Sequence, residues 1–439
     1  MKRITFFITI CFLTAGCSAI EPHKLDVSDF GAIADGKTDC TKAFQNALDK
    51  AAEKGLTVFV PAGKYAIKGT LKMPYATSLE GTWQGPHFPH LDKGSTLLAY
   101  AGREDESSIP FIQMGTSCTL TGFTIYYPEQ KYDDIKPYPW TIQAYGSRFN
   151  IYNMTFVNSY NGIDCGTKHN AGHNLRDIQI CALRRGIYID RTTDVGRIEN
   201  IHVHAVNWWR IYPRGKLPPD FKETINKFTL ENLEGFIIGR CDWEYMNNCF
   251  VIWPKIGFHF VETIPAADGS QRLKGYANIV ITQSGSDIGP VAVKIEKIQD
   301  HAGISFENSQ FMNGIEISEK NTGPLKLSNC GFWGMTRTGA IILNRGKGTV
   351  MVNNSHFSAG ATLPDYKWDP NIPFIQMYDG ALMMNNCLFK DYGHTPEHHI
   401  LIDGNTKAVS LTGTTVQGGT LKVKNHTKID IPDYSNTGK

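Results

Sequence analysis

Short apolar motifs with glycine at their second position recur along the chain at a nearly constant spacing. They begin at Asn161, Arg185, Glu234, Ile256, Asn313 and Thr338, and after the glycine the side chains alternate between two faces, as in a strand. The apolar residues that follow are 24, 22 and 26 residues apart for the pairs Ile163 and Ile187, Phe236 and Phe258, and Ile315 and Ile341. Such periods are typical of solenoids, whose coils bury their faces only against neighbouring coils. The spacing therefore predicts a parallel β-helix, whose long ladder of outward side chains suits a long polymer.

The chain is long enough, at 439 residues, to bury a large core in one elongated domain, which we expect over residues 25–430. Its 41% hydrophobic and 20% charged residues are ordinary for a soluble globular protein. The 44 basic and 42 acidic residues give a net charge of +2, without a long run of Lys or Arg. This balance argues against a nucleic acid as partner. The sequence leaves the oligomeric state unknown.

The first residues have the pattern of an export signal. Met1-Lys-Arg is positively charged, the run from Ile4 to Leu13 is apolar, and Thr14-Ala-Gly-Cys17 resembles a bacterial lipoprotein cleavage box, with Leu13 one place further from the cysteine than usual. We expect residues 1–17 to be a signal peptide ending at a lipidated Cys17. The alternative is an ordinary secretion signal. Either way the mature protein is expected outside the cytoplasm, in the cell envelope of a Gram-negative-type bacterium, touching a membrane only through the lipid.

The remaining cysteines are scattered, and none forms a Cys-x-x-Cys pair. Cys165, Cys249 and Cys330 fall at apolar positions of expected strands. We therefore expect buried thiols in stacked coils and no zinc site, and the sequence leaves open whether any of them form disulfides.

Residues 25–70 have the pattern of a cap for the first coil. An amphipathic helix is expected over residues 40–54, with Phe44, Ala47, Leu48 and Ala51 on one face. Asp39 is the expected N-cap and Gly55 the C-cap. A solenoid needs such a cover over its first exposed coil.

This opening segment resembles a known signature. Asp29-Phe-Gly-Ala-Ile-Ala-Asp-Gly-Lys-Thr-Asp39, the helix beginning near Ala43-Phe44, and Val60-Pro-Ala-Gly-Lys-Tyr65 are similar to the start of the pectate-lyase-like superfamily. This group includes polygalacturonases, rhamnogalacturonases and tailspike enzymes. The resemblance implies an all-β fold, a single-stranded right-handed parallel β-helix with an N-terminal capping helix, but it does not specify a reaction.

Asparagine recurs near the ends of the expected strands, as at Asn153, Asn329, Asn354 and Asn386. Because Asn tolerates the left-handed turn conformation, we interpret these residues as coil corners and not as ligands.

Two stretches interrupt the period. Phe236 follows Ile187 by 49 positions, about twice the local period, and we expect a long loop there. Its aromatic and basic residues Trp208, Arg210 and Arg214 are candidates for binding a sugar, since rings stack on sugar faces and Arg pairs with carboxylates. The second interruption is 359–373, with Tyr366 and Trp368. Either loop could instead only cover the sheet edge.

Aligning the glycine motifs brings polar residues together. Asp164 aligns with Tyr188 of the next motif, and His259 aligns with Tyr188 two motifs later. Asp190 lies one outward-facing position beyond Tyr188 on the same strand. Neighbouring strands are about 4.8 Å apart, so residues on adjacent coils lie within catalytic distance. The candidate cluster is completed by acids just past these strands: Asp242, Glu244 and Glu262.

Hydrolysis of a glycosidic bond needs two carboxyl groups, one as proton donor and one as base or nucleophile. The segments 186–202 and 239–245 resemble bacterial proteins related to polygalacturonases, and this similarity favours Asp190, Asp242 and Glu244 as the catalytic residues. The known polygalacturonase constellation is missing: there is no Asp-Asp after a strand, no Gly-His-Gly and no Arg-Ile-Lys. The catalytic residues of that family therefore cannot be transferred.

The leading expectation is hydrolysis of a uronate-containing polysaccharide or oligosaccharide, without a cofactor or metal. The first alternative is a polysaccharide lyase acting by β-elimination, in which Arg197 or another arginine, or Ca²⁺, would neutralise the uronate carboxylate, although no compact Asp-rich calcium motif is present. The second is a non-catalytic glycan-binding surface protein. His202 and His204 share one strand face, and we expect a structural role for them.

Overall fold

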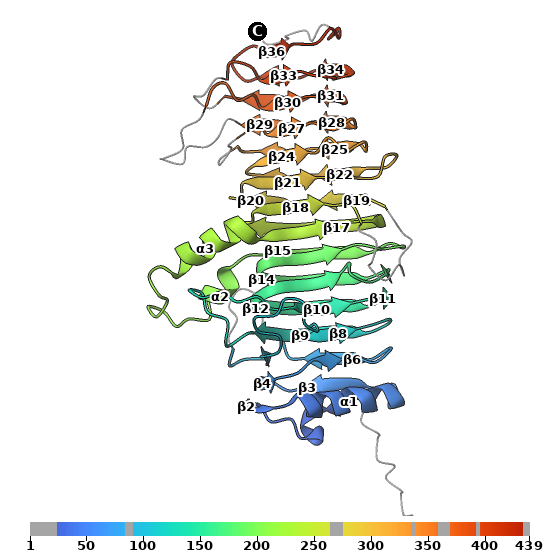
Figure 1. Ribbon diagram of the computed structural model, residues 1–439, viewed down its shortest axis with the longest axis vertical. Helices are drawn as coiled ribbons and strands as arrows, with labels where there is room; N and C mark the ends of the chain where they lie inside the picture. Colours follow the sequence, from blue (N-terminus) through green and yellow to red (C-terminus); the bar gives the residue numbers. More distant parts are fainter. Residues whose placement is uncertain are drawn as a thin grey trace, which may run out of the picture.

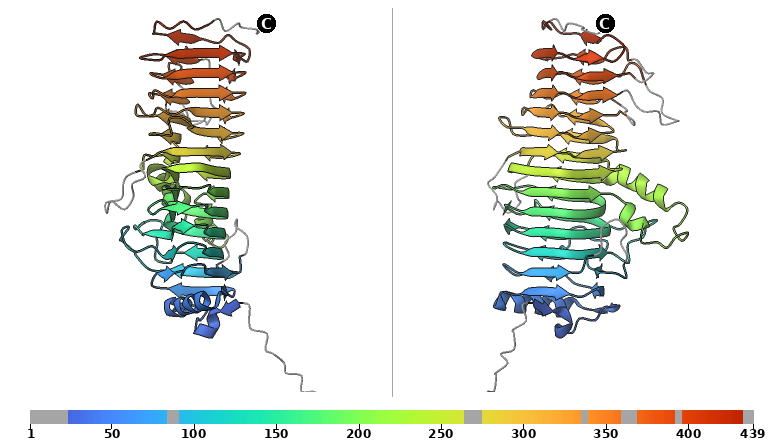
Figure 2. Two further views of the ribbon diagram at one scale, coloured as in Figure 1. Left: turned by 90° about the vertical axis from the view of Figure 1, so that its right-hand side faces the viewer. Right: turned by 180° about the vertical axis from the view of Figure 1, so that it is seen from behind.

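The chain folds into a right-handed parallel β-helix in which strands of successive coils pair in register. The computed structural model describes residues 24–83, 91–263, 275–334, 339–358, 369–391 and 396–432. Figures 1 and 2 show the coils stacked along one long axis, with the N-terminal helix at one end. The expected signal peptide and Cys17 lie outside the described residues, as do Tyr366 and Trp368 of the second interruption. Within the described residues, no helix is both long and apolar enough to cross a membrane.

Each coil contributes to three ladders of parallel strands. We call the first the groove ladder. Its strands are β5 (Leu71–Lys72), β8 (Ile112–Met114), β10 (Trp140–Ala144), the second halves of β12 (Asn150–Cys165) and β14 (Asn174–Ile189), β16 (Glu234–Ile238), β18 (Ile256–Phe260), β21 (Val291–Ile295), β24 (Gly314–Ile317), β27 (Ile342–Asn344), β30 (Ile375–Met377), β33 (Ile400–Ile402) and β36 (Val423–Asn425).

The second ladder consists of β1 (Lys24–Asp26), β3 (Thr57–Val60), β6 (Ser78–Gly81), β9 (Thr119–Tyr126), the first halves of β12 and β14, β15 (Arg197–Val203), β17 (Cys241–Ile252), β19 (Ala277–Thr282), β22 (Ile304–Glu307), β25 (Leu325–Ser328), β28 (Thr349–Asn353), β31 (Ala381–Asn385) and β34 (Ala408–Thr412). The third includes β2 (Asp35–Asp39), β4 (Gly63–Ile67), β7 (Ser95–Ala99), β20 (Gly285–Asp287), β23 (Gln310–Phe311), β26 (Gly331–Phe332), β29 (His356–Ser358), β32 (Leu388–Lys390) and β35 (Thr415–Val416). A separate small pair is formed by β11 (Gly146–Ser147) and β13 (Asn170–Ala171).

The glycine of the repeated motif allows the coils to approach closely. A Cβ atom at Gly162 would clash with the backbone carbonyl oxygen of Gly186, and one at Gly186 would clash with that of Gly235. The same holds between Gly235 and Gly257. Side chains are thus excluded from this column by the backbone of the next coil.

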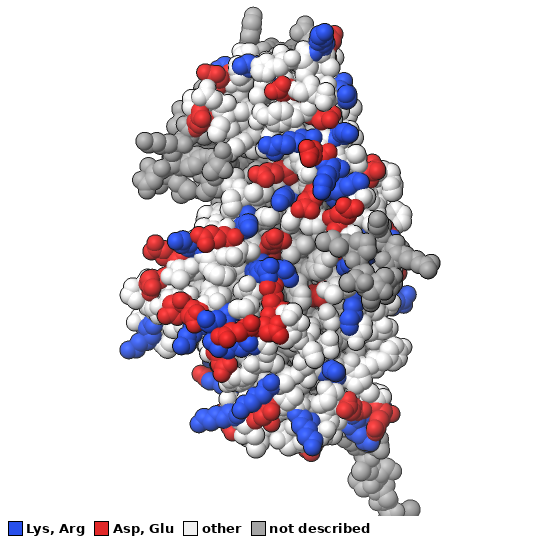
Figure 3. Space-filling model, in the orientation of Figure 1, with Lys and Arg blue, Asp and Glu red and all other residues white. Residues whose placement is uncertain are grey.

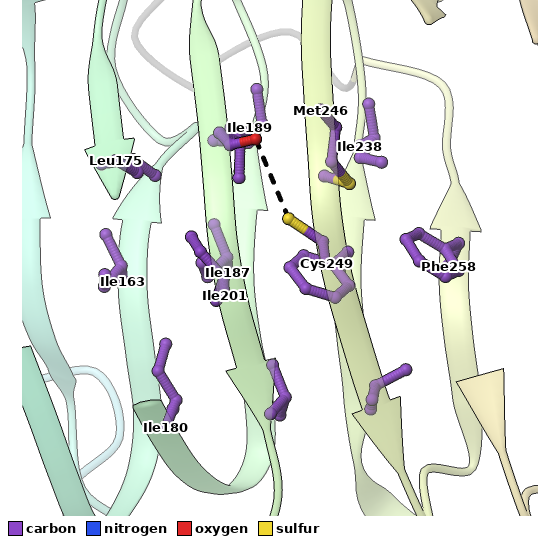
Figure 4. Packing of buried hydrophobic residues seen from close by; sticks show 14 of the residues in the cluster. Ile163, Leu175, Ile180, Ile187, Ile189, Ile201, Ile238, Met246, Cys249 and Phe258 are labelled. Atoms are coloured by element: carbon purple, nitrogen blue, oxygen red, sulfur yellow. Dashed lines mark hydrogen bonds between the residues drawn. The ribbon is translucent and has the colours of Figure 1, made fainter. Parts of the chain in front are cut away.

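The predicted stacking register is confirmed. Ile187 pairs with Phe236, and Phe236 with Phe258, and all three side chains are buried. The two phenyl rings lie 5.1 Å apart between centroids, with their planes at 14°. Figure 4 shows Ile163, Ile187 and Phe258 among the side chains that fill successive coils. One expected spacing is off by a residue, because Ile315 pairs with Ile342 and not with Ile341.

A column of left-handed residues turns each coil between the second and third ladders. Asn153, Asn329, Asn354 and Asn386 all have φ between 46° and 53°, as their interpretation as corner residues requires. Some corner side chains also bond to the next coil: the Nδ2 of Asn200 donates to Oδ1 of Asp177 over 2.7 Å. The corners therefore add hydrogen bonds along the solenoid axis.

The N-terminal cap is helix α1 (Thr41–Lys54), which follows a 3-10 turn (Val27–Phe30). Its buried face contains Phe44, Ala47, Leu48 and Ala51, as predicted, and Gly55 ends it in the left-handed conformation. The expected N-cap was wrong by one position: Cys40 is the N-cap, and Asp39 instead accepts a 3.0 Å hydrogen bond from the backbone N–H of Thr41.

The first interruption is not a simple loop, and that expectation was wrong. It contains two helices, α2 (Val206–Trp209) and α3 (Phe221–Asn232). Phe221, Ile225 and Thr229 are buried at the i, i+4, i+8 spacing of a helix face. They pack on a second apolar cluster over β12 and β14, and Figure 1 shows α3 projecting to one side of the solenoid beside these coils.

All eight cysteines of the described residues are buried, as predicted, and none of them forms a disulfide: Cys40, Cys118, Cys165, Cys181, Cys241, Cys249, Cys330 and Cys387. Cys249 is one example, and its thiol lies 3.9 Å from the carbonyl oxygen of Ile198 (Figure 4).

Candidate functional site

A groove of about 680 Å³ lies over the groove ladder, from Trp140 of β10 to Glu296 after β21, and Asn232 of α3 lines it. It is lined by Trp140, Thr167, Arg184, Arg185, Tyr188, Asn232, Glu234, Ile237, Val261, Glu262, Thr263 and Glu296. Figure 3 shows acidic and basic side chains gathered over the middle of this face. The groove thus combines aromatic surface with charges of both signs.

Two glutamates flank one histidine in the groove. His259, on β18, has Nδ1 3.0 Å from Glu234 of β16 and Nε2 3.1 Å from Glu296, which directly follows β21. The three residues stand on three consecutive coils. His259 is only 7% exposed, whereas the side chains of Glu234 and Glu296 are 28% and 41% exposed. Both carboxylates can therefore meet a ligand in the groove, while the imidazole fixes their positions.

The pKa of Glu234 lies below its ordinary value. Burial alone would raise this pKa, but the hydrogen bond and charge of His259 outweigh it, helped by Arg185 and Lys255. Glu234 is consequently ionised at neutral pH. An ionised carboxylate in a groove is suited to act as a base or a nucleophile.

Tyr188 donates a 2.7 Å hydrogen bond to Oδ2 of Asp190. Burial raises the pKa of Tyr188 strongly, and the Asp190 carboxylate raises it further. The phenol therefore keeps its proton over the whole physiological range. Tyr188 lines the groove as a neutral hydrogen-bonding group.

Trp140 and two arginines form one end of the groove. The Trp140 ring lies 6.3 Å from that of Tyr188, at 16° between planes, and the Arg185 guanidinium lies 5.6 Å from the Trp140 ring. Arg184 and Arg185 both pair with Glu106, yet about a third of each arginine side chain stays exposed, at 36% and 33%. This end offers an aromatic surface beside positive charge.

Asp164 and Asp190 have the positions that the alignment predicted. Asp164 pairs with Tyr188, and Asp190 follows β14 directly. Both are fully buried and fully hydrogen-bonded. Asp190 accepts from Tyr188, Thr263 and the backbone N–H groups of Arg191 and Arg240. Asp164 accepts from the N–H groups of Gly166 and Thr167 and from Gln143. Both carboxylates therefore hold neighbouring groups in position.

Asp242 and Glu244 do not join Asp190 in one accessible site, contrary to the expectation. A bulge between Cys241 and Glu244 shifts the register of β17 and points Glu244 into the coil interior, level with Ile279. There Glu244 is fully buried, with Oε1 2.9 Å from Nε2 of His173. Asp242 pairs with Arg240 over 2.7 Å and accepts from Gln299, and it does not line the groove.

The structure also separates the expected sugar-binding residues from the groove. Trp208 is 1% exposed and packs edge-on against Phe221, so its ring has no free face for a sugar. Arg210 ends α2, and Arg214 is exposed between α2 and α3. Arg197 is exposed on β15 of the second ladder. Of the expected binding residues, Tyr188 and Glu262 line the groove and His259 lies between its two glutamates.

Sequence reasoning missed Trp140, Glu234 and Glu296 as lining residues. Arg184 and Arg185, which also line the groove, are among the arginines that the lyase alternative offered for neutralising a uronate carboxylate. A signal existed for Glu234, which stands directly before the motif glycine at the position of Arg185 one coil earlier. Among the described residues, no group of three His, Cys, Asp or Glu side chains is arranged to hold a metal ion.

Comparison with known proteins agrees with the fold. Residues 25–191 match the family model described as rhamnogalacturonase A/epimerase, pectate lyase-like. This match confirms the resemblance to the pectate-lyase-like superfamily. The chain is also similar in structure to the catalytic unit of an α-1,3-glucanase from Streptomyces thermodiastaticus, at a TM-score of 0.51 and 12% identity over 91% of this chain and 69% of that one. At this identity the likeness shows the fold alone.

Curated relatives match only short segments. A polygalacturonase from Gossypium barbadense is 36% identical over 108 residues, which is 23% of this chain and 26% of that protein. A mannuronan C5-epimerase, AlgE1, from Azotobacter vinelandii is 42% identical over 59 residues, or 13% of this chain and 4% of that protein. The chain thus matches about a quarter or less of the length of these relatives.

Proposed function

We propose that the protein is a carbohydrate-active enzyme that hydrolyses glycosidic bonds of a uronate-containing polysaccharide or oligosaccharide. The observation that carries this proposal is the arrangement of Glu234 and Glu296 on either side of His259 in an open groove. Two hydrogen bonds and one imidazole ring separate the carboxylates, and glycoside hydrolases likewise use two carboxyl groups that flank the scissile bond.

The two glutamates take different roles in this proposal. Glu234, whose pKa is lowered, acts as the base or nucleophile. Glu296 acts as the proton donor to the leaving oxygen, with His259 between the two carboxylates to hold them apart. Trp140 stacks on a sugar ring, and Arg184 and Arg185 attract the uronate carboxylate.

β-Elimination is the second candidate, and the two partly exposed arginines favour it. An arginine pair at one end of the groove could neutralise the carboxylate of a uronate, which is the first requirement for removing its C5 proton. The named activities of relatives support this range of chemistry, since polygalacturonase, alginate lyase and mannuronan epimerase all occur among them.

One experiment separates the candidates. The protein is incubated with pectic, alginate and neutral polysaccharides, and three products are measured: reducing ends, the ultraviolet absorbance of an unsaturated uronate, and the sugar composition by NMR. Hydrolysis gives new reducing ends alone, whereas elimination gives both reducing ends and absorbance. Epimerisation changes only the composition, and a glycan-binding protein without activity changes none of the three. Absence of any product from every uronate polymer would contradict the proposal.

A further inference from the structure

A second hollow of about 500 Å³ lies further along the solenoid and has no role in the chemistry described above. It is lined by Glu319, Arg345, Lys347, Tyr378, Asp379 and Asn405. These residues follow strands β24, β27, β30 and β33 of the groove ladder. The hollow therefore belongs to the C-terminal coils, beyond the groove at β10 to β21.

The second hollow and the groove share one column of residues. The residue directly after each groove-ladder strand donates its backbone N–H to the preceding coil: Glu296 to Phe260, Ser318 to Ile295, Arg345 to Ile317, and Tyr378 to Asn344. Arg345 is thus two coils beyond Glu296 and Tyr378 is three. At the spacing of neighbouring strands these steps amount to about 10 Å and 14 Å. One polymer chain lying along the ladder would pass over both places.

The hollow is lined by two basic residues, Arg345 and Lys347, and by two acidic residues, Glu319 and Asp379. Arg345 and Lys347 are exposed, and neither forms an ion pair within the described part of the chain. The Arg345 guanidinium lies 5.8 Å from the ring of Tyr378, and Gln376 donates a 2.7 Å hydrogen bond to the Tyr378 hydroxyl. Two unpaired cations beside an oriented aromatic ring suit a ligand with a carboxylate and an apolar face.

We propose that this hollow is a remote subsite that binds one uronate residue of the same polysaccharide chain that occupies the groove. This inference rests on the proposed function. Arg345 and Lys347 bind the carboxylate, and Tyr378 stacks on the sugar ring. Glu319 and Asp379, the carboxylates of the lining, accept hydrogen bonds from its hydroxyl groups. A short oligosaccharide in the groove cannot reach this subsite, whereas a long one binds both places at once.

The test is calorimetric binding, which does not depend on turnover. The probes are digalacturonate, octagalacturonate, dimannuronate and octamannuronate, with a neutral malto-octaose for comparison. Three proteins are compared: wild type, the double variant Arg345→Ala/Lys347→Ala, and a control, Lys42→Ala/Lys54→Ala, which removes the same charge from exposed positions on α1. We expect the first double variant to bind an acidic octamer roughly tenfold more weakly than wild type does. The acidic dimers and the control variant should show no change.

Each outcome separates this inference from the proposed function. Equal affinity of wild type and Arg345→Ala/Lys347→Ala for both acidic octamers overturns the subsite, and so does failure of wild type to bind either octamer. An equal loss for malto-octaose overturns its assignment to a uronate. Length-dependent loss of binding without any turnover of polysaccharide supports the subsite and contradicts the hydrolase proposal. Turnover of polysaccharide without a length-dependent loss of binding supports the hydrolase proposal and contradicts the subsite.

Discussion

Glu234 places its Oε2 atom 3.0 Å from Nδ1 of His259, one coil further along the groove ladder. Since Glu296 lies 3.1 Å from the other nitrogen of the same ring, one buried imidazole sets the positions of two partly exposed carboxylates. This hydrogen bond links side chains of two neighbouring coils, in addition to the backbone pairing of their strands.

The first prediction concerns catalysis. Glu234→Gln and Glu296→Gln keep the size of each side chain but remove its role in proton transfer, so each should lower kcat by roughly 10²–10⁴. Steady-state kinetics on the identified substrate measure this effect. The matched control is Glu199→Gln, an exposed glutamate on β15 of the second ladder that does not line the groove, and it should keep wild-type turnover. Wild-type kcat in both groove variants would show that the reaction occurs elsewhere.

The second prediction concerns acid stability. The pKa of Glu234 is lower in the folded protein than its ordinary value of 4.5, so its ionised form stabilises the fold. This stabilisation is fully present above pH 4.5 and is lost as the pH falls through the lowered folded-state pKa. Wild type should be more stable than Glu234→Gln at neutral pH, and the difference should shrink below pH 4.5. Urea denaturation from about pH 7 to about pH 3 measures it; a constant difference would contradict the prediction.

The third prediction contrasts two tryptophans. Trp208 is buried against Phe221, so Trp208→Ala should cost about 3–5 kcal/mol of unfolding free energy or loosen the α2–α3 insertion. Trp140 lines the groove, so Trp140→Ala should mainly raise KM and cost only about 0.5–1.5 kcal/mol, as for one aromatic pair. Denaturation midpoints and kinetics are measured on both variants. If Trp208→Ala raised KM without lowering the denaturation midpoint, Trp208 would be a sugar-binding residue as the sequence predicted.

The fourth prediction concerns the core. Phe258 is fully buried and stacks on Phe236, so Phe258→Ala should lower the free energy of unfolding by about 3–5 kcal/mol. Tyr245→Ala on the outer face of β17, where the side chain is 47% exposed, serves as the control and should have a much smaller effect. An unchanged denaturation midpoint for Phe258→Ala would contradict the stacking of these coils.

The fifth prediction concerns export. We propose that Cys17 carries a lipid, on the strength of the box that precedes it. Cys17→Ala should then move the protein from the membrane fraction to the soluble fraction, because the lipid supplies the membrane affinity. Fractionation of cells and mass spectrometry of the N-terminus test it. An unmodified N-terminus on wild type would refute the anchor.

The fold could be predicted from the sequence because its signals are local and repeated. The motif glycines Gly162, Gly186 and Gly235 mark close contacts with the next coil. The apolar residues that follow the glycines, such as Ile187 and Phe236, pair in the order that the spacing predicts. The α2–α3 insertion could have been recognised too, since Phe221, Ile225 and Thr229 have helical spacing. The aromatic and basic residues that precede α3 favoured the interpretation of this segment as a loop.

The site was harder to predict because it depends on irregularities. Glu244 was expected on the surface, but the bulge before it turns its side chain inward, and nothing in the local pattern marks that bulge. Glu296 follows its strand while Glu234 begins one, so aligning the motifs places them in different rows. They belong to one site because the His259 side chain contacts both of them. Strand periodicity alone does not indicate which side chains from different rows will contact each other.

The close glycine column has a consequence for product size. Because neighbouring backbones touch there, the rise from coil to coil cannot relax, and any two groups on the groove ladder are separated by whole steps of about 4.8 Å. Chain-length preference in such a scaffold changes in fixed steps: gaining or losing one complete coil between Glu296 and Arg345 would change the length of the preferred fragment by about one such step.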